Sequence, residues 1–149
     1  MKKIYLVSFF AVVALCAKII TFGSCCAAGA STEVLIDGEN RSWDGAPLID
    51  YPTGKPSITL LRITVAPKSK LPQHYHPVIN VGYMLEGSLT VTDDKGNSKT
   101  ITAGEPLIET VNTIHYGENR GDTDAVILVF YAGEAGETIT EISDTYPKK

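Results

Sequence analysis

The three histidines of this 149-residue chain are the residues whose type and spacing could do chemistry. His74 and His76 are two residues apart, and side chains with that spacing point to the same face of an extended strand. Such a pair can bind one metal ion, with Nε2 at about 2.0–2.1 Å, if a third ligand converges from another strand. His115 lies 39 residues after His76, where a closed sheet could bring it back to the pair. The histidines therefore predict a site for one divalent transition metal ion, with Zn, Fe, Ni, Cu and Mn as candidates.

Short strands are the elements that would have to position these side chains. Period-two alternation, rich in β-branched and aromatic residues, recurs along the chain, and turn residues separate the runs. We expect strands over residues 57–66, 79–93, 98–102, 106–111, 124–133 and 137–142, with turns at 93–97, 103–105, 117–122 and 133–136. No helical window has comparable strength. The pattern predicts an all-β sandwich or barrel.

Two segments carry a family resemblance. The stretch KSKLPQHYHPVINVGYMLEG resembles the first motif of the cupin superfamily, G-x5-H-x-H-x3,4-E-x6-G, with His74, His76 and Gly87 in register. The stretch GEPLIETVNTIHYGEN resembles the second motif, G-x5-P-x-G-x2-H-x3-N, with Gly104, His115 and Asn119 in register. Both motifs together, in the right order and joined by a short hairpin, are more specific than either alone.

The resemblance covers about residues 57–132 and implies the organisation of the chain. It implies a single jelly-roll barrel (double-stranded β-helix) of cupin type over 57–142, followed by a C-terminal tail at 143–149. Residues 31–56 contain Pro47, Pro52 and Gly54, and we expect an irregular arm there with one short strand over 33–36.

The sequence departs from the family motifs at four positions. Lys68 stands where the first glycine is expected, and Thr110 and Asn112 replace the proline and glycine of the second motif. Asn80 stands in the place of the metal-binding glutamate. An amide in place of that carboxylate leaves the ion fully dipositive, which makes it more Lewis acidic and favours metals that prefer imidazole.

The fourth metal ligand would be Asn80 or Glu109. Glu109 interrupts an otherwise apolar run, and it resembles the glutamate that some small cupins carry just before the second-motif turn. If its side chain faces the interior, Glu109 is a ligand, a partner of a ligating histidine or a catalytic general base. If it faces outward, it is an ordinary solvated carboxylate. Strand parity alone does not distinguish the two faces.

Three further residues are candidates for the wall of a pocket. Arg62 could bind a substrate carboxylate if it faces inward, whereas an outward Arg62 would extend into solvent. Tyr83 and Phe130 could line the same pocket, although aromatic residues in strands commonly serve packing alone.

Two functions follow from these expectations. The first is a metalloenzyme that acts on a small organic molecule, for which the resemblance implies dioxygenase, isomerase or decarboxylase chemistry. The second is a non-catalytic module that binds a metal or small ligand without redox or acid/base chemistry, and such a module could tolerate Asn80. The resemblance also implies that homodimers are common.

The charge balance and the first residues bear on partners and location. A net charge of −4 without a basic cluster disfavours nucleic acid as a partner. Lys2, Lys3 and the apolar run from Ile4 to Ala17 predict a signal peptide over residues 1–30, cleaved after Ala30. The predicted mature protein is exported, periplasmic or secreted, and does not span a membrane. An uncleaved anchor helix and a lipid-modified Cys25 are the alternatives.

Overall fold

Strands, turns and irregular segments make up the whole of residues 29–143, the part of the chain that the computed structural model describes. Residues from Val34 onward belong to one compact unit, and the strands of the described residues all lie in it. The strands are β1 Pro56–Val65, β2 Ser69–Lys70, β3 His74–Tyr75, β4 Ile79–Glu86, β5 Ser88–Asp93, β6 Ser98–Thr102, β7 Pro106–Ile108, β8 His115–Asn119, β9 Ala125–Glu134 and β10 Glu141–Ile142. The expectation of an all-β fold is confirmed.

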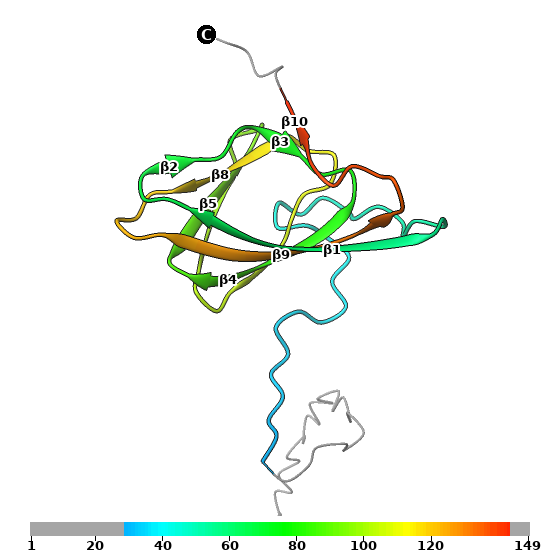
Figure 1. Ribbon diagram of the computed structural model, residues 1–149, viewed down its shortest axis with the longest axis horizontal. Coiled ribbons are helices and arrows are strands. Elements are labelled where there is room, and N and C mark those ends of the chain that lie inside the picture. The colour runs from blue at the N-terminus through cyan, green and yellow to red at the C-terminus, as the bar shows by residue number, and fades with distance from the viewer. Residues whose placement is uncertain (1–28, 144–149) are drawn as a thin grey trace, which may run out of the picture. The chain divides into compact units, whose positions relative to one another are not determined.

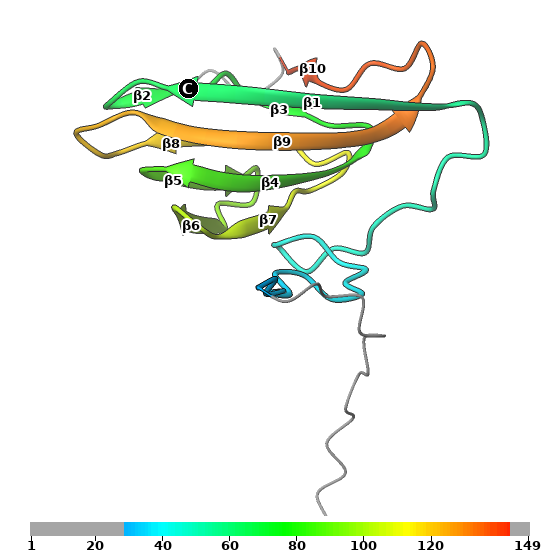
Figure 2. The same ribbon diagram turned by 60° about the horizontal axis from the view of Figure 1, so that its bottom comes forward.

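Two sheets form the unit (Figure 1). In the first sheet the strand order is β1-β9-β4-β7, and Figure 2 shows its long strands side by side. In the second sheet the order is β10-β3-β8-β5-β6, with β2 paired to β8. All strand pairs are antiparallel, and the connections between the sheets are those of a jelly roll.

Apolar side chains from both sheets meet in a single core. The first sheet contributes Met84, Leu107 and Val129, and the second contributes Leu89 and Ile101. All of these side chains are at most 5% exposed. This burial is the hydrophobic driving force that holds the two sheets face to face.

The expected strand over 79–93 is two strands that belong to different sheets. The chain turns at Gly87, where φ is 71° and where a Cβ atom would lie 2.5 Å from the carbonyl oxygen of Asp124. Only glycine fits this combination of positive φ and close backbone approach. The alternation of apolar residues continues through the turn, so the sequence pattern does not reveal it.

Three other boundaries differ from expectation. Residues 33–36 form no strand, and the pairing described for the arm is an isolated bridge between Arg41 and Pro47. Only 141–142 of the expected strand 137–142 is paired. Conversely, part of the expected turn at 117–122 belongs to β8, because β8 pairs with strands on both sides despite its poor β-formers Gly117 and Asn119.

Most of the predicted leader lies outside the described residues. Of the segment 1–30 only residues 29 and 30 are described, and of the tail 143–149 only residue 143. The three cysteines, Cys16, Cys25 and Cys26, are likewise outside. Among residues 29–143, no helix has the length and apolar character needed to cross a membrane.

Candidate metal centre

The fold brings the three histidines into one cluster. His74 on β3 is the cross-strand partner of His115 on β8, and His76 directly follows β3 and bridges to Val111. The imidazole ring centroids are 4.6–5.0 Å apart, and one ring nitrogen from each histidine lies within 4.8 Å of the others. His76 and His115 are each only 2% exposed. The expectation that the three histidines lie close enough to bind one metal ion is confirmed.

The Nδ1 atom of each histidine lies within hydrogen-bonding distance of a backbone carbonyl oxygen. Nδ1 lies 2.8 Å from the Pro72 carbonyl oxygen in His74, 2.9 Å from the Ile139 oxygen in His76 and 2.8 Å from the Thr113 oxygen in His115. A carbonyl oxygen can only accept, so each Nδ1 carries the hydrogen. The neutral tautomer then presents the lone pair of Nε2, as in histidines that bind metals.

Glu109 faces the interior and reaches two of these nitrogens. Its Oε2 lies 3.0 Å from Nε2 of His76 and 3.2 Å from Nε2 of His115. Glu109 follows β7 on the same face as the buried Leu107, and its backbone N–H donates to the carbonyl oxygen of Asn80. The sequence left open whether the Glu109 side chain faces inward or outward, and in the structure it faces inward.

Buried charge at this cluster alters the pKa of its members. Burial alone would raise the pKa of Glu109, but hydrogen bonds and charge interactions with His115 and His76 outweigh it and hold that pKa below its ordinary value of 4.5. Burial alone would lower the pKa of His115, and the bond and charge of Glu109 raise it above 6.5. Burial lowers the pKa of His74. The cluster therefore favours a positive charge between Glu109 and the two buried histidines.

The geometry requires a cation among these atoms. Two Nε2 lone pairs and a carboxylate oxygen at about 3 Å repel one another unless a proton or a metal ion lies between them. Ligands at about 2.0–2.2 Å from one ion are separated by about 3 Å when their bond angles are near 90–110°. The Glu109 contacts of 3.0 and 3.2 Å match this separation. The donor set of three imidazoles and one carboxylate thus fits a divalent transition metal.

Asn80 lies inside the fold as well. It is fully buried on β4, its Nδ2 donates to the Val78 oxygen at 3.3 Å, and Oδ1 has no hydrogen-bond partner among the described residues. Glu109 contacts two histidine nitrogens, and no such contact is present for Asn80. A carboxylate next to the histidines is therefore retained, although it comes from the segment after β7 and not from the position on β4 that the family motif predicts.

At two of the four motif departures the backbone has the positive φ that is typical of glycine. Lys68 and Asn112 both stand where the family motifs have glycine, and both have a φ of 55°. Asparagine tolerates this left-handed conformation. Lys68 is held there by an ion pair of 2.9 Å to Asp122 and a bond to the Arg120 carbonyl oxygen. The turns that precede the histidines therefore keep the conformation for which glycine is usually selected.

The three pocket candidates all lie on the outward face of the first sheet. Along β1, β4 and β9 the buried residues alternate, and Arg62, Tyr83 and Phe130 have the opposite parity. Arg62 forms an exposed ion pair with Glu86 at 3.6 Å, and Phe130 is 41% exposed. Both faces of these strands are rich in apolar residues, so alternation alone did not identify the inner one.

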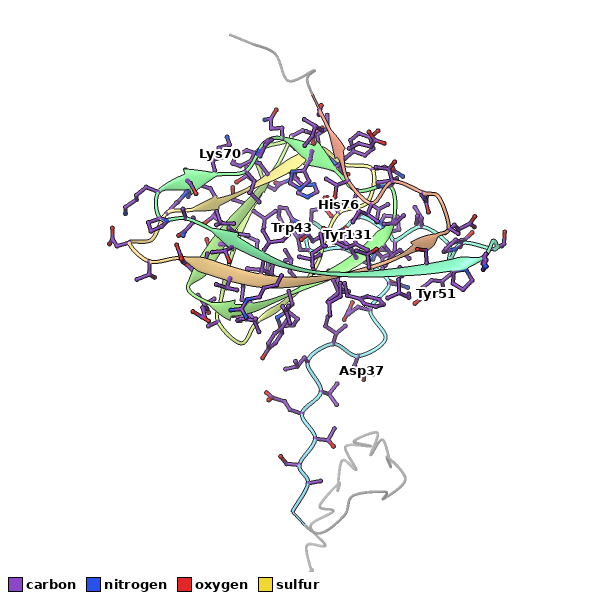
Figure 3. The ribbon with its side chains drawn as sticks, in the orientation of Figure 1. Asp37, Trp43, Tyr51, Lys70, His76 and Tyr131 are labelled. Carbon is purple, nitrogen blue, oxygen red and sulfur yellow. The ribbon has the colours of Figure 1, made fainter. Side chains whose placement is uncertain are left out.

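Two cavities adjoin the histidines. The inner cavity, of about 40 Å³, is lined by Ile63, Leu71, His74, His76, Leu89, Val91, Glu109, His115, Gly117, Ile127, Val129 and Tyr131. The outer cavity, of about 200 Å³, is lined by Leu61, Ile63, Leu71, Pro72, His74, His76, Tyr131, Thr140 and Ile142. Tyr131 lies against His76 with ring centroids 5.4 Å apart (Figure 3). His74, His76 and Tyr131 line both cavities, so the outer cavity reaches His74 and His76 directly. Strand periodicity carried no specific signal for Leu61 or Leu71 as wall residues.

Comparison with known proteins agrees with this architecture. Residues 61–131 match the Cupin domain family. Germin-like protein 1-1 of Oryza sativa subsp. japonica is 33% identical over 79 residues, which are 50% of this chain and 37% of that protein. Germin-like protein subfamily 2 member 2 of Arabidopsis thaliana is 38% identical over 77 residues, 48% of this chain and 35% of that protein. The chain thus spans little more than a third of the length of these relatives.

A solved structure shows the same fold. The structure of an oxalate oxidase in complex with the substrate analogue glycolate superposes with a TM-score of 0.50 at 24% identity, covering 57% of this chain and 45% of the other. The jelly roll, the two motifs and the match over residues 61–131 support membership of this chain in the cupin superfamily.

Proposed function

We propose that this cupin holds one divalent metal ion on His74, His76, His115 and Glu109 and presents it to a small organic molecule in the outer cavity. The observation that carries the proposal is the convergence of one carboxylate oxygen on two histidine nitrogens at 3.0 and 3.2 Å. The histidine Nδ1 bonds to backbone carbonyls support it, because they orient Nε2 towards the same point. We assign the cupin domain to 57–142, with 31–56 as an arm.

Each residue has a distinct part in this proposal. The three imidazoles bind as neutral ligands, and Glu109 balances one of the two positive charges of the ion in a buried site. When bound, the ion supplies Lewis acidity that can polarise an oxygen of the ligand. The outer cavity reaches His74 and His76, and this access favours a site that binds a substrate over a closed structural site. Dioxygenase, isomerase or decarboxylase chemistry is the activity class we propose.

Metal removal should lower the thermal stability of the protein. Zinc at about one hundred times its dissociation constant stabilises a fold by about 2.7 kcal/mol, which for a domain of this size is on the order of 10 °C in Tm. The gain should be full at pH 7.5. It should fade as the pH falls, beginning above 6.5, because His115 has a raised pKa and binds a competing proton early.

Thermal melts with and without a chelator, combined with elemental analysis of untagged protein, measure this. Identical melting temperatures at pH 7.5 in zinc-loaded and chelator-treated protein would contradict a metal site. The elemental analysis also identifies the resident ion.

Export and assembly are separate proposals. We propose that residues 1–30 are removed on export, which N-terminal sequencing of the mature protein would show as a start at Ser31. The homodimer stays a prediction, supported by the exposed apolar side chains of Ile58, Leu60 and Phe130 on the outer face. Light scattering of the purified protein measures it.

A further inference from the structure

The size of the outer cavity and the kinds of side chain in its wall indicate what it can bind. Its volume of about 200 Å³ exceeds the roughly 150 Å³ of an engineered apolar cavity that binds benzene. The mouth lies between β1, the edge strand of one sheet, and β10, the edge strand of the other. It therefore has room for a molecule built on about one ring, with one end reaching His74 and His76.

Apolar side chains form most of its wall. Leu61 and Ile63 project from β1, Leu71 and Pro72 come from the segment before β3, and Ile142 comes from β10. Leu61 is 37% exposed and Ile142 is 60% exposed, so both have apolar surface that a ligand would cover. Burying an apolar ligand body against this wall lowers the free energy of binding, whereas a charged body finds no favourable partner there.

The polar groups of the wall are already occupied. Thr140 Oγ1 lies 3.1 Å from Nδ1 of His76 and also bonds the Tyr131 hydroxyl. A hydroxyl and a phenol are both neutral at pH 7.5. Neither group offers a charge to a ligand.

Within residues 29–143, no lysine or arginine lines either cavity. Lys70, on neighbouring β2, lies over the ring of Tyr116 at 3.3 Å, and Arg62 is on the outer face with Glu86. Among the described residues, Glu109 is the one carboxylate that lines the inner cavity, and the chain has a net charge of −4. A dianion such as oxalate would leave water here with only the metal ion to compensate it, against the field of Glu109.

We infer that this site takes a small neutral molecule with an apolar body of about one ring and a polar donor group directed at the metal, and that it discriminates against small dianions. The inference rests on the proposed metal site and deepens it. It departs from the substrate named for the oxalate oxidase that shares the fold. The preference comes from the walls of the outer cavity, so it depends on Leu61 and its neighbours and is independent of the outer sheet face.

The test compares three probes on the zinc-loaded protein by titration calorimetry at pH 7.5. Benzohydroxamic acid and acetohydroxamic acid are neutral in solution and share one chelating group, and they differ only in the ring. Oxalate is the dianion. Benzohydroxamic acid should bind at least about tenfold more tightly than acetohydroxamic acid, because the ring covers apolar wall. Oxalate should bind more weakly than both.

A pair of variants on the same strand locates the preference. Leu61→Asp adds a charge to the wall of the outer cavity and should abolish the tenfold preference for the ring. Leu60→Asp is the matched control, because Leu60 is 62% exposed on the outer face, and it should retain the preference. Circular dichroism melts establish that both variants are folded.

The outcomes separate the two proposals. If elemental analysis finds no zinc after loading, the metal site itself is wrong. If zinc is bound but the ring adds no affinity, no probe binds, or oxalate binds most tightly, the metal site stands and the inference about the ligand is overturned. Equal effects of Leu61→Asp and Leu60→Asp would also overturn it.

Discussion

Removing one ligating histidine should cause the largest loss of metal of any single substitution. His115→Ala and His76→Ala should weaken zinc binding by similar factors of more than about a hundredfold, since each deletes one ligand from the same ion. The similarity is expected because both rings are 2% exposed and both approach the same Glu109 oxygen, at 3.2 and 3.0 Å. Zinc titration with a competing chelator measures the two dissociation constants.

Tyr116→Ala is the control for the histidine variants. Tyr116 follows His115 on β8 and packs against Lys70, so its removal perturbs the same strand without removing a ligand. Melts of the metal-free variants separate a folding defect from loss of metal. Normal zinc content in folded His115→Ala would place His115 outside the coordination sphere and would refute the proposed site.

Glu109→Gln should produce the second large effect. The substitution keeps the shape of the side chain and removes its negative charge, and we expect zinc affinity to fall by at least about 10- to 100-fold. The loss should be visible in the same chelator competition. Because the charge of Glu109 raises the pKa of His115, the variant should also lower the pH at which His115 titrates in the metal-free protein. Histidine NMR signals report that shift.

The matched control for Glu109 is a half-buried glutamate that lines neither cavity. Glu118→Gln on β8 removes a carboxylate that pairs with Arg120 at 2.7 Å, away from the cavities, and should leave zinc affinity unchanged. If Glu109→Gln binds zinc as the unmodified protein does, the fourth ligand is elsewhere. Asn80→Ala then tests the buried amide whose Oδ1 lacks a partner among residues 29–143. Loss of zinc only in Asn80→Ala would assign the metal to Asn80.

The sign of the pH effect on the metal-free protein differs between histidines. A raised pKa at His115 stabilises the fold below 6.5, and this stability is lost as the pH rises through the folded-state value. The lowered pKa of His74 acts in the opposite direction, because the unfolded chain binds that proton more readily below 6.5. The contribution of His115 therefore changes with pH above 6.5, and that of His74 changes below 6.5 with the opposite slope. The titration of individual histidines is therefore more informative than the melting temperature of the metal-free protein.

The sequence by itself determined the fold class and the members of the histidine cluster. Period-two alternation predicted most of the long strands, including β1, β6 and β9, within a residue or two. The spacing of His74 and His76, with His115 in the second motif, identified the three residues that the fold brings together. These features are local, because they depend on strand periodicity and on residue types that only a few kinds of chemistry require.

Only the tertiary structure decided which face of each strand is inside. Arg62, Tyr83 and Phe130 are outward and Glu109 is inward, although their local patterns gave both faces an apolar character. A side chain's face depends on the register with which its strand pairs and on what covers the sheet, and neither is encoded in the alternation itself. The turn at Gly87 and the extent of β8 likewise depend on contacts with segments that are distant in the sequence. The position of the carboxylate beside the histidines is therefore a property of packing, and the sequence alone could offer it only as one of two alternatives.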